Sequence, residues 1–268
     1  MAAAIIIPLW CTIHLFTSPI ALAPGSSSRA QAKTSLLVHP TELKVLPWSL
    51  LIGAGIPTAL MVFSSAATVE PLYKSQQFWI VARFAHPLLT SATHLIISMF
   101  CHSSDASFMS AEQRNKGVLR ALEHVYSIAT YVAVVPHVAV FSIALLSQLA
   151  PAVFANGYQS LFSPTRIFWP VSLWTGVNPS KISIGSGSLM FLQWDEIVSC
   201  AAILIWAFAL NRQALSREPQ GSTSLGIVVR TCILTLVGGP AAAAISLIRE
   251  RDTVILESSS EVEEKKSL

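Results

Sequence analysis

The chain has 268 residues, of which 53% are hydrophobic and only 12% are charged, and its formal net charge is +3. A soluble domain carries about 25% charged residues, so the low charge and the long apolar runs indicate a polytopic membrane protein. The basic residues are scattered through short loops rather than clustered on one face, which argues against a nucleic-acid partner. The four cysteines lie singly in or beside apolar segments and lack the spacing of zinc ligands.

Six apolar runs reach or approach the length of about 20 residues that a helix needs to cross a bilayer. In chain order they cover residues 2–22, 46–63, 78–101, 126–150, 189–210 and 225–248. The first run could also be a signal peptide, because Ala21-Leu22-Ala23 is similar to a cleavage site, but no Lys or Arg precedes it and a spanning helix is preferred. The predicted fold is therefore all-α, a polytopic transmembrane helix bundle of about six to seven spans within residues 1–252.

Two parts of the chain differ from these apolar runs. Residues 151–187 combine many aromatic side chains with prolines, which predicts an interfacial loop or a lid over a cavity. Residues 253–268 are acidic and serine-rich, which predicts a disordered C-terminal tail. Lys265-Lys266 near its end resemble a dilysine retrieval signal, so we expect an integral protein of the endoplasmic reticulum membrane. A seventh crossing within 151–187 would put this tail and the basic loops on the same, cytosolic side. With six spans they would lie on opposite sides, and the Lys-Lys pair would then be a chance match.

Polar side chains recur at helical spacing inside several spans, so these helices each have one polar face. In the fifth span Asp195, Ser199 and Trp206 align, and Glu196 is displaced by roughly 100° around the helix. The other aligned sets are Trp10, His14 and Thr17 in the first span, Arg83, His86, Thr90, His94 and Ser98 in the third, and Ser127, Thr130 and His137 in the fourth. Because hydrocarbon disfavours charge, an acid in a span normally faces a protein interior or a water-filled cavity.

Several charged groups are expected at one depth, near the membrane face that carries the 151–187 loop. In the six-span model they are Glu70, Arg83, His86, Asp195, Glu196, Arg249, Arg251 and Asp252. This layout predicts a cavity covered by a lid. The structural alternative is that Arg83 pairs with Glu70 or Asp195, that charges near helix ends reach the interface, and that the histidines serve packing.

The absence of several sequence motifs argues against some classes of enzyme. The chain has no glycine-rich phosphate loop, no HExxH or paired-histidine motif for a metal, and no GxSxG nucleophile elbow. The pair Asp195-Glu196 is too little to hold Mg²⁺ and a diphosphate without a second acidic cluster. Acid catalysis in an apolar, aromatic cavity, with no metal and no cofactor, is the chemistry that remains.

Three blocks of the sequence resemble a known family. They are "PLWCTIHLFTSP" (8–19), "FLQWDEIVSCAAILIWAF" (191–208) and "GGPAAAAISLIRERD" (238–252), and they are similar to blocks of the small integral-membrane terpene cyclases of fungal meroterpenoid and related isoprenoid clusters. The resemblance implies a chain embedded in the lipid bilayer and a small-molecule prenylated substrate, whose terminal alkene or epoxide is protonated by a buried acid. In the Gln-Trp-Asp block that acid would be Asp195.

Such a reaction assigns roles to further residues. Burial favours the protonated form of a carboxyl but does not make it a strong acid, so a neighbour such as Glu196, Glu70 or a histidine would have to activate the donor. Aromatic faces stabilise a carbocation without quenching it. The candidates for contact with the substrate or the cation are Trp10, Trp79, Trp194, Trp206, His14, Arg83 and His86.

Two other functions compete with this one. The chain could be a non-catalytic membrane scaffold or assembly partner whose polar face binds another subunit. It could also be a proton-coupled transporter, although the small number of helices and the lack of repeated halves argue against this. No pattern in the sequence specifies the substrate or the oligomeric state.

Overall fold

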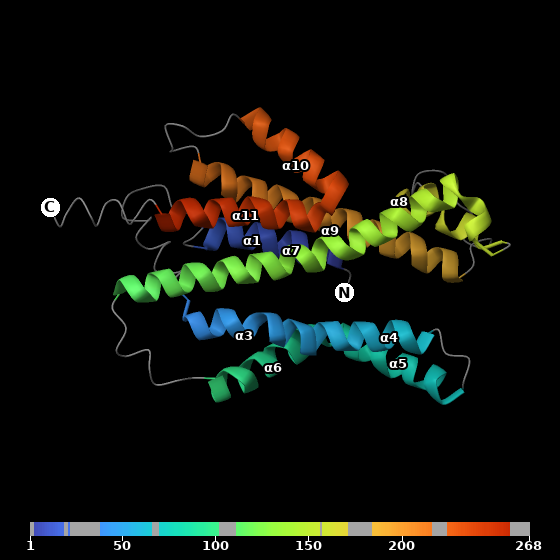
Figure 1. Cartoon of the computed structure of the whole chain (residues 1–268), viewed down its shortest axis with the longest axis horizontal. Helices are drawn as coiled ribbons and strands as arrows, with labels where there is room; N and C mark the ends of the chain where they lie inside the picture. The colour runs from blue at the N-terminus through green and yellow to red at the C-terminus, as the bar shows by residue number, and fades with distance from the viewer. Residues whose placement is uncertain are drawn as a thin grey trace. The chain divides into compact units, whose positions relative to one another are not determined.

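The structure is a computed structural model that describes residues 3–18, 21, 38–65, 70–101, 111–155, 157–170, 184–215 and 224–257. Every regular element in these ranges is helical, which confirms the predicted all-α fold (Figure 1). The chain divides into two units, one of residues 37–129 and one of residues 1–36 with 130–268. Each unit is described by itself.

The unit of residues 37–129 begins with α3 (Pro40–Leu50), η1 (Leu51–Gly55) and α4 (Ile56–Ser65), which follow one another without a break. Pro40 suits the first position of a helix, and the His39 side chain accepts a hydrogen bond from the backbone N–H of Thr41. Together these elements form an apolar helix over Pro40–Ser64 that is long enough to span a membrane. This helix starts six residues before the span predicted at 46. The prediction began too late because the charged residues in the first turns lower the hydropathy there.

The next helices of this unit are α5 (Glu70–Phe84) and α6 (His86–Cys101), which meet at Ala85 with a bend of 69°. Pro87 explains the break, since a proline has no N–H to donate to the preceding turn and fits only the first turn of a new helix. The predicted continuous span 78–101 is therefore corrected to a bent pair. The unit ends within α7 (Ala111–Leu149), which continues into the second unit.

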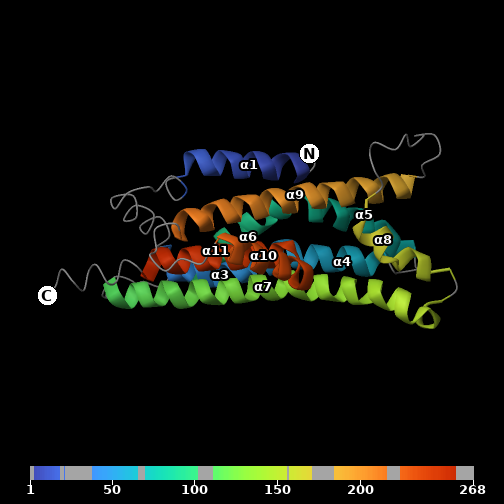
Figure 2. The ribbon, with the colours of Figure 1, turned by 90° about the horizontal axis from the view of Figure 1, so that it is seen from above.

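The other unit contains α1 (Ala3–Thr17), the second half of α7, and the short elements η3 (Pro151–Val153), η4 (Gln159–Phe162) and α8 (Pro164–Phe168). Its main helix is α9 (Ile184–Leu215), which contains no proline. The chain ends with α10 (Ser224–Gly238) and α11 (Pro240–Glu257). Both α1 and α11 lie alongside α9, and α10 packs on α11 (Figures 1 and 2).

The predicted sixth span, 225–248, is also corrected, because it is two helices joined at Gly239. This glycine has φ +88°, a left-handed conformation that closes a helix and that other residues rarely adopt. A Cβ on Gly239 would lie 2.9 Å from the His137 ring, so the turn also packs tightly on α7. Pro240 then occupies the first position of α11.

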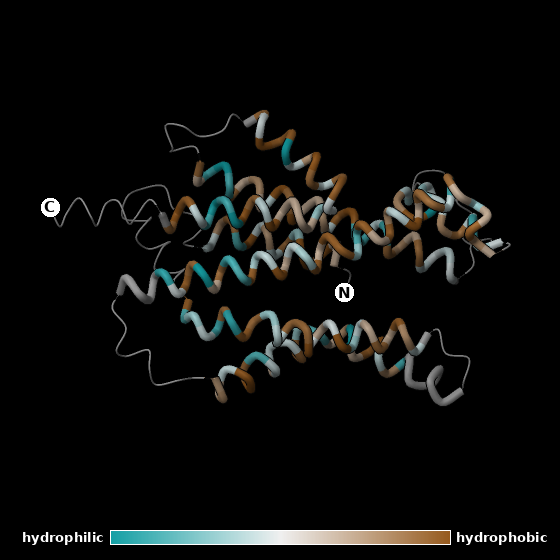
Figure 3. Tube along the Cα trace, viewed as in Figure 1, coloured by the Kyte–Doolittle hydropathy of each residue, from teal (hydrophilic) through white to brown (hydrophobic). Residues whose placement is uncertain are grey.

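Three of the described helices are long and apolar enough to cross a membrane, or four if the bent pair counts as one span. They are Pro40–Ser64, Lys116–Leu149 and Gly185–Leu215, with Gln77–Phe84 and His86–Cys101 as the bent pair. The predicted six to seven spans are not confirmed, since α1 and α10 are shorter apolar helices. Apolar residues recur along these helices (Figure 3), and large ones such as Phe63 and Phe100 stay exposed, as expected for surfaces that face lipid.

The structure describes only parts of the predicted interfacial loop 151–187 and of the predicted tail 253–268. The predicted loop 151–187 contains η3, η4 and α8, and residues 171–183 lie outside the described residues. Helix α9 begins at Ile184, so the loop is shorter than expected. Helix α11 continues to Glu257, past the predicted start of the tail at 253, and residues 258–268 with Lys265-Lys266 lie outside the described residues.

Candidate functional site

Asp195 is held by the first turn of α1. It lies half-buried in the apolar part of α9, and its Oδ1 accepts a hydrogen bond from the backbone N–H of Ala4 at 2.7 Å. The first N–H groups of a helix have no acceptor in their own helix, so a carboxyl oxygen is a favourable partner for them. Within the described residues, the other carboxyl oxygen, Oδ2, has no hydrogen-bond partner. One oxygen of Asp195 is thus fixed and the other is available.

The side chain of Glu196 has a different environment from that of Asp195. Its side chain is exposed, and its Oε1 accepts a hydrogen bond from Cys200 Sγ at 3.2 Å. The structure therefore does not bring the two adjacent carboxyls onto one face of α9. The half-buried Trp194 precedes them, and Gln193 donates to the backbone oxygens of Arg166 and Ile167 in α8.

The structure brings three of the predicted aromatic residues together. Trp206 Nε1 donates a hydrogen bond to His14 Nδ1 at 3.1 Å. The ring centroid of Trp10 lies 5.2 Å from that of His14 and 5.5 Å from that of Trp206, and the His14 and Trp206 centroids are 5.3 Å apart. Because Nδ1 accepts this bond, the ring proton of a neutral His14 resides on Nε2. Trp10 is 53% exposed, so part of its surface remains open.

These contacts define a line of polar and aromatic groups between α1 and α9. Ala4 contacts Asp195 and His14 contacts Trp206, so residue numbers rise together and the two helices run parallel. We call this line the α1/α9 seam, formed by Ala4, Trp10, His14, Asp195, Ser199 and Trp206. Asp195 and Trp206 lie about 16 Å apart along the axis at a rise of 1.5 Å per residue.

Helices α10 and α11 support α9 behind this seam. Asn211 is fully buried, and its Nδ2 donates to the backbone oxygen of Leu247 at 2.9 Å and to Glu250 Oε2 at 3.0 Å. Glu250 also forms an ion pair with Arg230 of α10. The buried Arg251 and Asp252 pair with each other at 3.0 Å. The block 238–252 therefore contributes packing and polar anchoring to α9.

The remaining predicted site residues lie in the unit of residues 37–129. Trp79 is half-buried and packs edge to face against Phe78, with 5.0 Å between the two ring centroids. Arg83 Nη1 lies 2.8 Å from His86 Nδ1 across the bend between α5 and α6. The described contacts of Arg83 therefore do not include the expected pairing with Glu70 or Asp195. Glu70 begins α5, but its side chain lies outside the described part of the chain.

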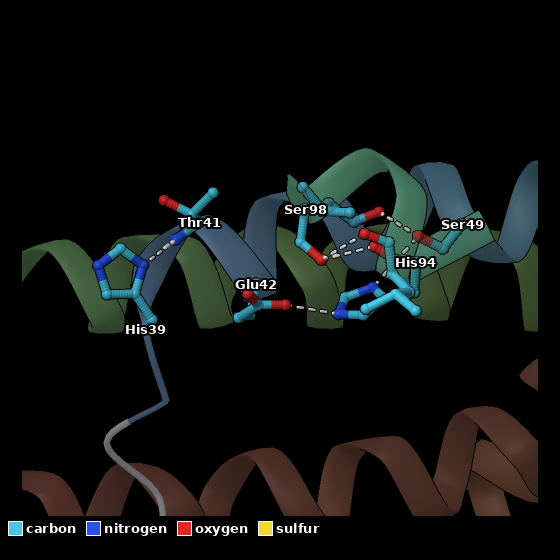
Figure 4. A network of polar contacts seen from close by, with 8 residues as sticks. His39, Thr41, Glu42, Ser49, His94 and Ser98 are labelled. Carbon is cyan, nitrogen blue, oxygen red and sulfur yellow. Dashed lines mark hydrogen bonds and ion pairs between the residues drawn. The ribbon is translucent and has the colours of Figure 1, made fainter. Parts of the chain in front are cut away.

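This unit has a polar network of its own, which the sequence analysis missed (Figure 4). His94 Nε2 lies 2.7 Å from Glu42 Oε2, and its Nδ1 lies 3.2 Å from Ser49 Oγ. The Ser49 hydroxyl has one proton and donates it to the backbone oxygen of Val45, so Nδ1 of His94 is the donor to Ser49. Both ring nitrogens of His94 and the hydroxyl of Ser49 have partners, which is the pattern of a packing contact between α3 and α6.

The same two segments also approach closely one helical turn further along. A Cβ on Gly53 in η1 would lie 2.5 Å from the backbone of Thr90 in α6, so only glycine fits there. Small residues allow membrane helices to approach in this way. We call Glu42, Ser49, Gly53, Thr90 and His94 the α3/α6 seam. The predicted stripe in the third span is thereby divided, since Thr90, His94 and Ser98 belong to α6 while Arg83 precedes the bend.

Comparison with known proteins connects the chain to one family. The model of the CtvD domain matches residues 1–256. The terpene cyclase ascI of Acremonium egyptiacum is 30% identical over 267 residues, which cover 98% of this chain and 62% of that protein. The terpene cyclase ctvD of Aspergillus terreus is 24% identical over 253 residues, 93% of this chain and 64% of that protein.

A third relative is the terpene cyclase verU1 of Penicillium polonicum, which is 27% identical over 252 residues, 93% of this chain and 60% of that protein. The chain thus spans about three-fifths of the length of the curated relatives that it matches. No solved structure matches the chain.

Proposed function

Because the chain belongs to the CtvD domain family, we propose that it is a terpene cyclase of the membrane, which closes rings in a linear prenyl chain carried by a small meroterpenoid-type precursor. Three relatives named terpene cyclases match nearly the whole chain, which supports the reaction class. The apolar helices support membrane association. The endoplasmic reticulum is the proposed membrane.

Asp195 is the proposed proton donor, and its contact with α1 is the observation that carries the proposal. Ala4 binds one carboxyl oxygen and leaves the other without a partner among the described residues. The oxygen without a partner is an atom from which a carboxyl can give a proton to an alkene or epoxide. The proposal gives this role to Asp195 alone, because Glu196 is exposed and bonded to Cys200.

The aromatic part of the α1/α9 seam has the proposed role of stabilising the carbocation. Indole faces attract cations, by about 2 kcal/mol or more when the contact is desolvated. His14 fixes the ring of Trp206 by accepting its N–H, and as a neutral ring it adds no positive charge beside the cation. Trp10 offers its exposed surface to the prenyl chain. Trp194 is close to Asp195 in sequence and completes the set in this unit.

The residues of the other unit have weaker support. Trp79 remains a proposed aromatic contact, and Arg83 with His86 remains a proposed polar contact for the substrate. Glu70 remains a proposed activating neighbour of the proton donor, on the sequence alone. Their described contacts are with neighbours in their own unit.

The proposal is tested by expressing this chain alone in yeast microsomes. The probes are a linear prenylated phenol and its terminal epoxide, without added metal or nucleotide. A cyclised product of the same mass as its substrate is the expected result, because protonation-initiated cyclisation is an isomerisation. Both substrates recovered unchanged, with the protein folded and abundant, would contradict catalysis and favour a non-catalytic partner protein.

A further inference from the structure

Ser199 has a buried hydroxyl for which the described part of the chain provides no hydrogen-bond partner. The side chain is 6% exposed, and its Oγ is unpartnered within the described residues. Serines in helices ordinarily donate to a backbone oxygen three or four residues earlier, as Ser98 does to His94 and Ser127 does to Glu123. An unpaired buried hydroxyl destabilises a fold. Ser199 therefore keeps its donor available at a cost to stability.

The two other unpartnered buried atoms in the described residues have structural explanations. Thr90 Oγ1 lies at the close approach of α6 to Gly53, where a Cβ on the glycine would be 2.6 Å from it. Asn211 Oδ1 belongs to an amide whose Nδ2 makes two hydrogen bonds. In Ser199, as in Thr90, the unpartnered atom is the only polar atom of the side chain, but Ser199 lies on the face of α9 that contacts α1.

The position of Ser199 connects it with the proposed acid. Residues four apart on a helix have Cβ atoms about 5–6 Å apart on one face, so Ser199 neighbours Asp195. Asp195 and Trp206 both contact α1, and Ser199 lies between them on the same face of α9. Rotation about the Cα–Cβ bond turns the hydroxyl between the backbone and the carboxyl of Asp195.

We propose that Ser199 is a positioning residue whose hydroxyl donates a hydrogen bond to Asp195 as that carboxyl gives up its proton. The inference rests on the proposed function. In the step, the O–H bond of Asp195 breaks and a bond from that proton to the substrate's terminal alkene carbon or epoxide oxygen forms. The new carboxylate accepts hydrogen bonds from the Ala4 N–H and the Ser199 O–H, and Ser199 keeps its own proton. The cyclised cation later loses one proton, so no net proton is consumed.

The proposed hydrogen bond from Ser199 would help the half-buried carboxyl of Asp195 to release its proton. Burial favours the protonated form, so it supplies a proton but opposes its release. A hydrogen bond that forms only when the carboxylate forms stabilises the transition state more than the ground state. Such a bond raises kcat without tightening substrate binding, because it is absent in the bound ground state.

The test compares Ser199→Ala with Ser64→Ala in the full chain in microsomes, using the prenylated phenol or the epoxide that the wild type converts. We expect Ser199→Ala to lower kcat about 10-fold or more with an unchanged KM. Its thermal midpoint in detergent should be unchanged or higher, because the orphan hydroxyl is gone. Ser64 is equally buried at 6%, but its hydroxyl donates to the backbone oxygen of Met61. Ser64→Ala should therefore keep kcat and lose stability slightly.

A third variant keeps the test decisive. Ser199→Thr retains the hydroxyl and should restore most of the lost kcat. Wild-type kcat in Ser199→Ala would overturn the inference while leaving the cyclase intact. A second outcome would also overturn the inference. If Ser199→Ala has a lower thermal midpoint and a lower kcat than the wild type, and Ser199→Thr has the same low kcat, then the hydroxyl does not serve the reaction. A wild type that converts neither probe removes the proposed function itself, which is a distinguishable result.

Discussion

The α1/α9 seam and the α3/α6 seam both place polar groups between apolar helices, yet they differ in how those groups are satisfied. In the α3/α6 seam, Glu42, His94 and Ser49 bond to one another and to the backbone, and Gly53 brings the helices together. The unpartnered Thr90 Oγ1 of this seam lies at that close approach to Gly53. In the α1/α9 seam, one oxygen of Asp195 and the hydroxyl of Ser199 have no partner within the described residues. Satisfied polar groups stabilise packing, whereas groups left available can act on a substrate.

The largest predicted effect on the α3/α6 seam is that of Gly53→Ala. The new Cβ would lie 2.5 Å from backbone atoms of Thr90, which cannot move as a side chain can. Overpacking of this kind costs about 1–3 kcal/mol, and we expect the upper end. The measurement is the thermal midpoint in detergent, with Gly185→Ala as the control, since nothing lies within 4 Å of its Cβ. Equal stability of the two variants would show that the close approach is absent.

A smaller loss is expected when the network of Figure 4 is broken. Glu42→Gln removes the carboxylate from His94 Nε2, and the pair should couple by about 1 kcal/mol in a double-mutant cycle with His94→Asn. Stability of the four proteins in detergent supplies the cycle. Turnover per folded molecule should not change in Glu42→Gln. A lower kcat with normal stability would instead make the α3/α6 seam part of the catalytic machinery.

Trp206→Phe should have a modest effect that appears in turnover. The variant loses the N–H that donates to His14 and has a weaker cation-binding face than indole, so about 1 kcal/mol of transition-state stabilisation, or about fivefold in kcat, should be lost. Trp48→Phe is the matched control, because Trp48 is exposed on α3. Equal kcat values for both variants would remove Trp206 from the reaction.

Sequence patterns predicted one of these seams better than the other. Helical spacing placed Asp195, Ser199 and Trp206 on one face of α9, and the structure agrees. The docking of Ala4 on Asp195 was not predictable, because it depends on two segments far apart in the chain running parallel. Helical spacing also displaced Glu196 from that face, but only the structure shows its bond to Cys200.

The errors in the predicted spans have a common physical origin. Hydropathy detects the length of an apolar run but not a break in the helix. The spans predicted across Ala85 and Gly239 were therefore continuous, although the chain bends at Ala85 and turns at Gly239. Pro87 and the sequence Gly238-Gly239-Pro240 carried the signals for both breaks. Glu42 was missed because its charge placed it outside the apolar run, although His39 and Pro40 indicate that the helix begins before it.

The central claim is that Asp195 donates a proton, and Asp195→Asn tests it most directly. Asparagine keeps the size and an oxygen for the Ala4 N–H, so α1 should stay docked and the protein should remain abundant. The account predicts a loss of cyclised product by about 100-fold or more in microsomes, with a smaller loss for the neighbouring Glu196→Gln. Wild-type turnover by folded Asp195→Asn would contradict the account.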